Sequence, residues 1–263
     1  MLRPRESRNL RLIAHDLELS PAATLTWAND VSGNAVATAA FGHPSRTLTV
    51  DSFAELDLDV EQWPVFPIAA SAATYPFLLT EDEMLDLGGL RLQAYLDSSG
   101  TLRDWAQGFV GGTPTDTLIL LKDLCAGAAA HITYEVREDE GTQSPAETLD
   151  RRRGSCRDFA ALFVDAVRSL GFGSRIVSGY LYDPDQNAVG SEGAGSTHAW
   201  AEVYVPGAGW ITFDPTNRSV GGFNLIPVAV ARNIRQTIPV SGSFAGDRAP
   251  FEGMDVRVRV TRT

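Results

Sequence analysis

Cys156 lies where a loop gives way to a strongly amphipathic stretch, a position that can activate a thiol. The apolar residues of that stretch recur with helical spacing up to a stop at Gly171: Phe159, Ala160, Phe163, Ala166, Val167 and Leu170. The free amide groups and the dipole of a helix N-terminus favour thiolate over thiol, and the same amide groups can receive an oxyanion. A cysteine at a helix start is more often structural than catalytic, so its partners decide whether Cys156 is a candidate nucleophile.

His198 and Asp214 are the partners that the strand pattern supplies. His198 opens the strand predicted for 197–205, and Asp214 ends the strand predicted for 209–214. A short turn at 206–209 makes the two strands a hairpin, so the start of the first lies beside the end of the second. The two side chains therefore fall at the same end of a ladder, as an imidazole base and its orienting carboxylate require. Trp200 shares the face of His198 and either borders the site or fills the core.

The elements that must position these residues follow an α+β plan. Helical periodicity predicts helices over 101–110, 115–131 and 156–170. Enrichment in β-branched and aromatic residues predicts strands over 174–182, 197–205, 209–214, 223–231 and 254–261. Helices followed by antiparallel strands indicate an α+β core, with Cys125 as a buried thiol on the apolar face of the second helix.

The chain before this core has a different pattern. Between residues 9 and 60, short alternating runs are separated by turn residues, which predicts a small antiparallel β-domain. Prolines then punctuate the stretch that follows. We predict an N-terminal β-domain over 1–63, a linker and connecting segment over 64–100, and a catalytic core with closing strands over 101–263.

Four segments of the core resemble the bacterial transglutaminase-like cysteine protease family, within the papain-like superfamily. They are GSCRDFA at 154–160, SGYL at 178–181, THAWAEVY at 197–204 and GWITFDPTN at 209–217. The resemblance implies that Cys156 is the nucleophile, that His198 is the general base and acid, and that Asp214 orients His198. It also implies that the β-rich segment before Trp63 is the N-terminal β-domain of bacterial members. Arg232 begins a short departure from the family pattern that leaves the triad intact.

Composition and charge exclude several function classes. The chain carries 22 basic and 33 acidic residues, a formal net charge of −11, which argues against binding to nucleic acid or to an anionic membrane. Two cysteines in 263 residues and a start without an apolar leader predict free thiols in a cytoplasmic protein. The basic run Arg151–Arg153 and Arg157 flank Cys156 and are expected to form a solvated charged face rather than an acidic-substrate site.

No metal or other cofactor is predicted. Cys156 and His198 lack further Cys or His ligands nearby, and His15, His43 and His131 lie in unrelated contexts. Asp183, Asp185 and Asn187 imitate the opening of a calcium loop, but Ala188 and Ala194 stand where such a loop needs Gly and Glu. We expect this segment to be a hairpin loop. We expect Asp158 to cap the helix that begins after Ser155.

These observations predict a cysteine-dependent acyl-transfer enzyme acting on a peptide or protein. Hydrolysis of a peptide or isopeptide amide through a thioester on Cys156 is favoured, because water needs no second binding groove and the chain offers one lysine, Lys122, for crosslinking. A protein-glutamine transglutaminase with an amine acceptor is the alternative, because the triad chemistry is common to both. A non-catalytic interaction module is a third possibility, disfavoured because all three triad positions are filled.

Overall fold

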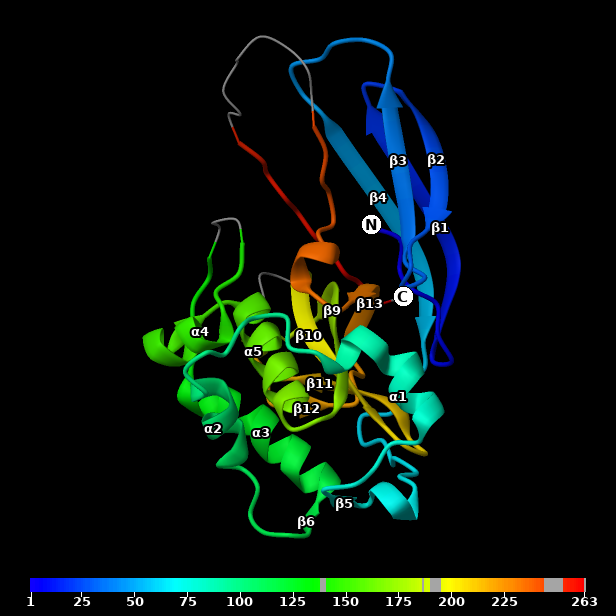
Figure 1. Cartoon of the computed structure of the whole chain (residues 1–263). Helices are drawn as coiled ribbons and strands as arrows, with labels where there is room; N and C mark the ends of the chain where they lie inside the picture. Colours follow the sequence, from blue (N-terminus) through cyan, green and yellow to red (C-terminus); the bar gives the residue numbers. More distant parts are fainter. Residues whose placement is uncertain (138–140, 186, 190–194, 244–252, 263) are drawn as a thin grey trace.

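A five-stranded antiparallel sheet forms the centre of the structure. The computed structural model describes residues 1–137, 141–185, 187–189, 195–243 and 253–262 (Figure 1). The sheet order is β12-β11-β10-β9-β13. Its strands are β9 (Gly173–Tyr182), β10 (Gly195–Val205), β11 (Gly209–Asp214), β12 (Ser219–Val220) and β13 (Leu225–Ala231). Four of the five predicted core strands are therefore confirmed.

Helices gather on one side of this sheet (Figure 1). They are α2 (Thr101–Gln107), α3 (Thr117–His131), α4 (Pro145–Arg151) and α5 (Cys156–Ser169). The central helix α5 packs on β9 and β10, and its Phe163 ring lies 5.4 Å from the ring of Phe213 in β11. Cys125 of α3 is buried in the same core, as predicted. These helices and strands confirm the α+β plan.

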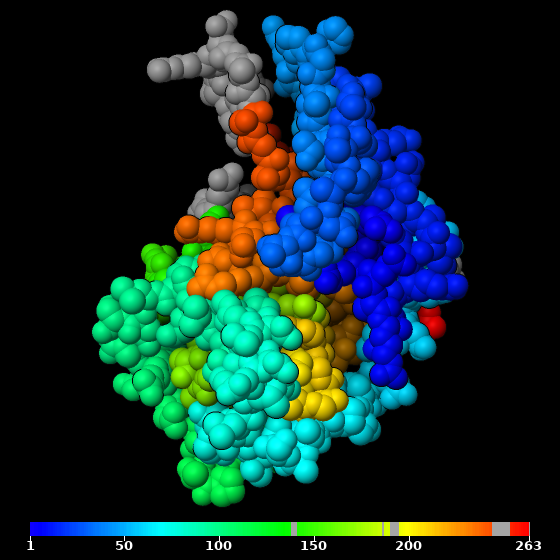
Figure 2. Space-filling model, turned by 45° about the vertical axis from the view of Figure 1, so that its right-hand side comes forward, coloured from blue at the N-terminus to red at the C-terminus, as the bar shows by residue number. Residues whose placement is uncertain are grey.

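The predicted antiparallel β structure before residue 60 is also confirmed. Its strands are β1 (Leu10–Ser20), β2 (Ala23–Asn29), β3 (Ala35–Phe41) and β4 (Thr49–Leu58), paired as β1 with β4 and β2 with β3. Asn34, in the turn between β2 and β3, joins them to the core: its Nδ2 donates to Val230 O and its Oδ1 accepts from Val230 N, both at 2.8 Å. Arg5 N also donates to Pro227 O at 2.7 Å. Figure 2 shows the N-terminal atoms lying against the segment that contains β13.

The segment predicted as a linker contains more structure than expected. It holds α1 (Glu81–Leu87), the short 3₁₀ turns η1 (Ala70–Ala72) and η2 (Gly88–Arg91), and strand β5 (Thr74–Tyr75), which pairs with β6 (Thr115–Asp116). α1 begins with a capping box, in which Glu83 N donates to Thr80 Oγ1 and Thr80 N donates to Glu83 Oε2. We did not predict this helix because prolines punctuate the stretch before Thr80, although the capping residues Thr80 and Glu83 are present in the sequence.

Two further differences concern α4 and the C-terminal segment. α4 was not predicted, although Ser144 caps it and Pro145 occupies its first turn. The strand predicted over 254–261 is wrong, because residues 253–262 form no strand in the structure. Valines alternate there, but the outer edge of β13 is already bonded by Asn34 and Arg5, so the segment has no ladder to join at that edge.

Short elements complete the chain. β7 (Thr133–Tyr134) and β8 (Arg153–Gly154) form a parallel pair beside the start of α5, and η3 (Ile234–Gln236) follows β13. The predicted hairpin loop after β9 lies partly outside the described residues. Within the described part of the chain, no helix is both long enough and apolar enough to span a bilayer.

Candidate active site

The start of α5 fixes the position of Cys156. Ser155 is the N-cap residue, and Asp158 Oδ2 accepts hydrogen bonds from Ser155 N at 2.8 Å and Ser155 Oγ at 2.9 Å. Asp158 is fully buried and also accepts from Arg137 at 2.9 Å and from Gln143 N at 2.7 Å. The predicted capping role of Asp158 is confirmed, and the contacts show that it also orders the chain before α4. Cys156 is therefore the first helical residue, held at a rigid helix start.

Residue 154 must be glycine for this arrangement. A Cβ atom at Gly154 would lie 2.8 Å from the Cβ atom of Asp158, closer than carbon atoms in contact allow. Any larger residue would move Asp158, and with it the cap on which Cys156 depends. The glycine of the GSC motif is thus explained by the close packing of Asp158 beneath it.

The hairpin of β10 and β11 brings His198 and Asp214 together, as the sequence predicted. Ala201 is opposite Phe213 in the register, so Asp214 lies near the position opposite Trp200, two residues from His198. His198 Nε2 donates to Asp214 Oδ2 at 2.8 Å, and both residues are almost fully buried. Since His198 also hydrogen-bonds Cys156, the ring nitrogen left for the sulfur is Nδ1.

Asn217 is a positioning residue that the sequence reasoning missed. Its side-chain Nδ2 donates to Asp214 Oδ2 at 2.8 Å, the same oxygen that holds His198. The other carboxylate oxygen, Oδ1, accepts from the backbone N–H groups of Thr216 at 3.0 Å and Asn217 at 3.3 Å. Asn217 Oδ1 in turn accepts from Val189 N at 2.7 Å. The asparagine of the DPTN motif therefore connects Asp214 to the segment after β9, and that motif was the available signal.

The electrostatics of the three residues favour a thiolate and imidazolium pair. Burial would raise the pKa of Cys156, but the hydrogen bond and charge of His198 and the N–H of Ala199 outweigh it, so that pKa lies below the usual thiol value. Burial opposes the charge on His198, yet Asp214 and the sulfur raise the pKa of His198 to about 10. The pKa of Asp214 is lowered despite burial, by His198 and by Asn217.

Cys125 provides the internal contrast. Burial, with a smaller contribution from the charge of Asp214, raises the pKa of the Cys125 thiol far above its usual value. Cys156, by comparison, is partly exposed, and both cysteines are free thiols, as predicted. Of the two cysteines, Cys156 alone has a partner that stabilises its thiolate.

Trp200 fills the core rather than an open wall of the site. Its side chain is 1% exposed and packs with Val177, Leu181, Leu225 and Val230 on the sheet face opposite α5. Its ring stacks near that of His198, with centroids 6.1 Å apart and an interplanar angle of 25°. It therefore holds the imidazole from within the core.

The other candidates named from the sequence have structural contacts. Arg151, Arg152 and Arg153 are exposed, and Arg151 pairs with Glu147 at 2.6 Å, as a solvated face would. Arg157 donates to Arg137 O at 3.0 Å. Arg232 donates to Gly89 O and Gln93 O and so fastens the segment after α1. Asp183 Oδ2 accepts from Ala188 N, which closes a turn, and the described residues contain no cluster of three or more Cys, His, Asp or Glu side chains placed to hold a metal ion.

Comparisons with known proteins indicate the kind of fold that carries this site. Residues 103–215 match the transglutaminase-like superfamily, and residues 1–57 match the bacterial transglutaminase-like N-terminal region. The uncharacterized protein Rv2569c of Mycobacterium tuberculosis is 28% identical over 282 residues, which cover 96% of this chain and 86% of that protein. A protein-glutamine gamma-glutamyltransferase of Pseudomonas aeruginosa is 26% identical over 112 residues, 41% of this chain and 16% of that protein.

A solved structure extends the agreement in fold to most of the chain. The crystal structure of a candidate cysteine protease from Cytophaga hutchinsonii superposes with a TM-score of 0.67 at 19% identity, covering 89% of this chain and 75% of that one. The predicted architecture, an N-terminal β region followed by a papain-like core with Cys156 at a helix start, is confirmed. The chain therefore carries a transglutaminase-like core behind an N-terminal region of the bacterial transglutaminase-like type.

Proposed function

We propose that the protein hydrolyses a peptide or isopeptide amide through a thioester on Cys156. The observation that carries this proposal is the continuous chain of contacts from Cys156 through His198 to Asp214, with the pKa of the thiol lowered and that of the imidazole raised. A thiol and an imidazole arranged in this way form an activated nucleophile and its general acid. A buried structural cysteine, as Cys125 illustrates, lacks both partners.

In the first half of the reaction the sulfur of Cys156 attacks the amide carbonyl carbon. The carbonyl π electrons move to oxygen, which the free N–H groups of the first turn of α5 can stabilise. When the C–N bond breaks, His198 gives its Nδ1 proton to the departing amine nitrogen and becomes neutral. The acyl group remains on sulfur as a thioester.

In the second half, neutral His198 removes a proton from water while the water oxygen attacks the thioester. Collapse of the tetrahedral intermediate breaks the C–S bond, releases a carboxylic acid and restores the thiolate and imidazolium pair. Asp214 keeps the imidazole in one orientation through both halves and stabilises its positive charge. Water as acceptor needs no second binding groove, which is why hydrolysis is our first choice.

A protein-glutamine transglutaminase is the second candidate, and the relative from Pseudomonas aeruginosa favours it. The two functions differ only in whether water or a primary amine resolves the thioester. We expect a peptide amide to yield free acid at a rate little changed by millimolar primary amine, with products measured by mass spectrometry and Cys156→Ala as the blank. Dominant covalent incorporation of amine would replace hydrolysis with amine transfer and leave the triad assignment in place.

Selective alkylation tests the nucleophile without any substrate. Near pH 6 we expect iodoacetamide to label Cys156 much faster than Cys125, because only Cys156 has a pKa lowered by an imidazolium. Peptide mass mapping locates the label, and the His198→Ala variant should lose most of the difference. Equal labelling of the two cysteines in the native protein would contradict the assignment.

A further inference from the structure

A pocket of about 440 Å³ is lined by residues that neighbour the candidate triad along the chain. One wall comes from the end of α3 and from β7, and the other comes from residues 187–189 and 216–218. It reaches the triad at two points. Phe159 lies one helical turn after Cys156, and Asn217 donates to Asp214.

Arg218 is the one charged side chain among the described residues that line this pocket. Its NH2 group donates to Ala129 O at 3.3 Å, and it forms no ion pair with any carboxylate in the described part of the chain. A guanidinium has five N–H donors, so most of its hydrogen-bonding capacity is left for a ligand. In a chain of net charge −11, an arginine without a carboxylate partner beside the triad marks a local preference for negative charge.

The apolar residues among the other lining residues indicate which chemical group of a substrate fits the pocket. Tyr134, which is partly exposed, and Val189, which is exposed, offer apolar surface to a short aliphatic chain, and the rings of Tyr134 and the buried Phe159 are 6.5 Å apart. Tyr134 is paired with Gly154, two residues before Cys156, so this surface belongs to the elements that carry the nucleophile.

We propose that this pocket binds a carboxylate-bearing residue in the acyl part of the substrate, with Arg218 as its specificity-determining residue. The inference rests on the proposed function and adds the substrate class to it. An aliphatic chain that ends in a carboxylate places its methylene groups on the apolar wall and its two oxygens on the planar guanidinium fork. The carboxylate comes either from an acidic side chain or from the main chain of an isopeptide-linked glutamate.

Arg152 provides a matched control for Arg218. Both arginines are exposed, and both have left-handed backbone conformations, with φ of 54° at Arg152 and 57° at Arg218. Arg152 is not among the residues that line the pocket. Replacing either one by glutamine removes the charge, shortens the side chain by the same amount and places glutamine in a similar left-handed backbone conformation. A difference between the two variants therefore depends on where the arginine lies.

The test measures how fast short peptide vinyl sulfones alkylate Cys156. One pair of probes carries Glu or Gln at the residue next to the warhead, and a second pair carries them one residue earlier. A third pair carries a γ-linked glutamate whose main-chain carboxylate is either free or amidated. We expect an acidic probe to react about twofold to fivefold faster than its neutral partner, which lies within the range that one exposed ion pair contributes. The second-order labelling rates are read by mass spectrometry in native protein, Arg218→Gln, Arg218→Glu and Arg152→Gln.

Arg218→Gln should abolish the preference, Arg218→Glu should reverse it, and Arg152→Gln should retain it. Whether the side-chain or the γ-linked probe shows the preference identifies the source of the carboxylate. Equal rates for acidic and neutral probes in the native protein, or an equal loss in Arg152→Gln, would overturn the pocket assignment while Cys156 is still labelled. Failure of every probe to label Cys156 would instead overturn the proposed function itself.

Discussion

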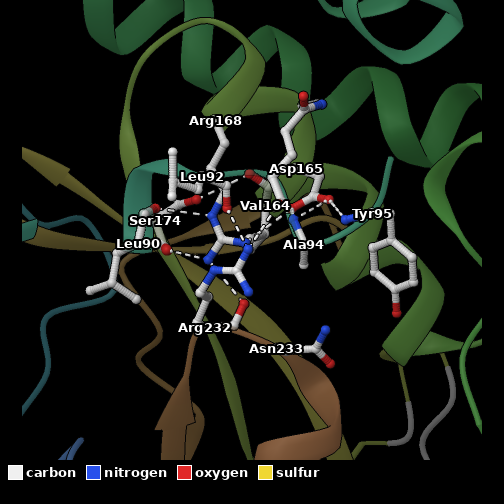
Figure 3. A network of polar contacts seen from close by, with 12 residues as sticks. Leu90, Leu92, Ala94, Tyr95, Val164, Asp165, Arg168, Ser174, Arg232 and Asn233 are labelled. Atoms are coloured by element: carbon white, nitrogen blue, oxygen red, sulfur yellow. Dashed lines mark hydrogen bonds and ion pairs between the residues drawn. The ribbon is translucent and has the colours of Figure 1, made fainter. Parts of the chain in front are cut away.

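Charged side chains are buried at both ends of α5, but only at the N-terminal end are two of them, Cys156 and His198, placed to exchange a proton. At the C-terminal end, Arg168 NH1 pairs with Asp165 Oδ1 at 3.0 Å, and its other nitrogens donate to the carbonyl oxygens of Leu90, Ser174 and Arg232 (Figure 3). Asp165 also accepts from the N–H groups of Ala94 and Tyr95. Burial lowers the pKa of Arg168 to about 10, against the opposing effect of Asp165, so Arg168 remains charged at neutral pH.

At the N-terminal end the charges are exchangeable. Cys156 and His198 share a proton, and the pKa values of both are shifted in the directions that favour the ionic form. Asp165 and Arg168 are satisfied mainly by fixed backbone groups, whereas Cys156 is partly exposed and has a partner that can release a proton. Burial and charge alone therefore do not identify a candidate reactive site. Such a site is identified by a thiol whose hydrogen-bond partner can take up and release a proton, as His198 can beside Cys156.

The largest expected effect on activity is that of His198→Ala. The variant lacks the group that activates the thiol and protonates the leaving amine, so we expect a loss of about 10³-fold in kcat/KM. Circular dichroism should show an unchanged fold. Activity at the native level in this variant would show that the N-terminal end of α5 owes no reactivity to His198, and the two ends would no longer differ in the way proposed.

Arg168→Met should give the opposite result, a loss of stability with little effect on activity per folded molecule. It leaves Asp165 buried without its cation, and breaking such a pair costs about 3–5 kcal/mol of unfolding free energy. Denaturant unfolding measures the loss, and counting sites with an alkylating probe normalises the activity. Because removing both charges avoids the unpaired ion, the double variant Asp165→Leu with Arg168→Met should recover part of the stability.

Asp214→Ala should be less severe than His198→Ala and should change the pH profile. Activity requires the ionic pair, which is lost as the pH falls through the lowered pKa of Cys156 and as it rises through the pKa of His198, about 10. Without the carboxylate that raises the pKa of His198, the alkaline limb should move to lower pH, with a loss of about tenfold or more in kcat. An alkaline limb that stays in place would show that Asp214 does not set the charge on His198.

Asn217→Ala is expected to have the smallest of these effects, a loss of about threefold to tenfold, because it removes one hydrogen bond to a charged group. Since that bond helps to hold the carboxylate of Asp214 in place against His198, its loss should weaken the support for the imidazolium, and the alkaline limb should shift in the same direction as in Asp214→Ala, but less. Asn233→Ala, an asparagine that caps η3 away from Asp214, is the control. A loss of stability without any change in the pH profile would assign Asn217 a purely structural role.

The sequence predicted the triad because local rules specify each part of it. A helix start places Cys156, and a tight hairpin register places His198 beside Asp214. Asn217 was missed because its role depends on the rotamer of one side chain within a turn. The Asp165 and Arg168 pair was equally hidden, since its partners at residues 90, 94, 174 and 232 are distant along the chain. The strand predicted over 254–261 failed because alternation shows that a segment suits a sheet, not that an edge is open.

The contact between Asn34 and Val230 has a consequence for self-association. β13 is an edge strand, and an edge with free N–H and C=O groups invites pairing with another chain. The Asn34 amide supplies one donor and one acceptor to the same residue of that edge, as a neighbouring strand would. One buried side chain thus occupies hydrogen-bonding groups of this edge that would otherwise be open to pairing with another strand.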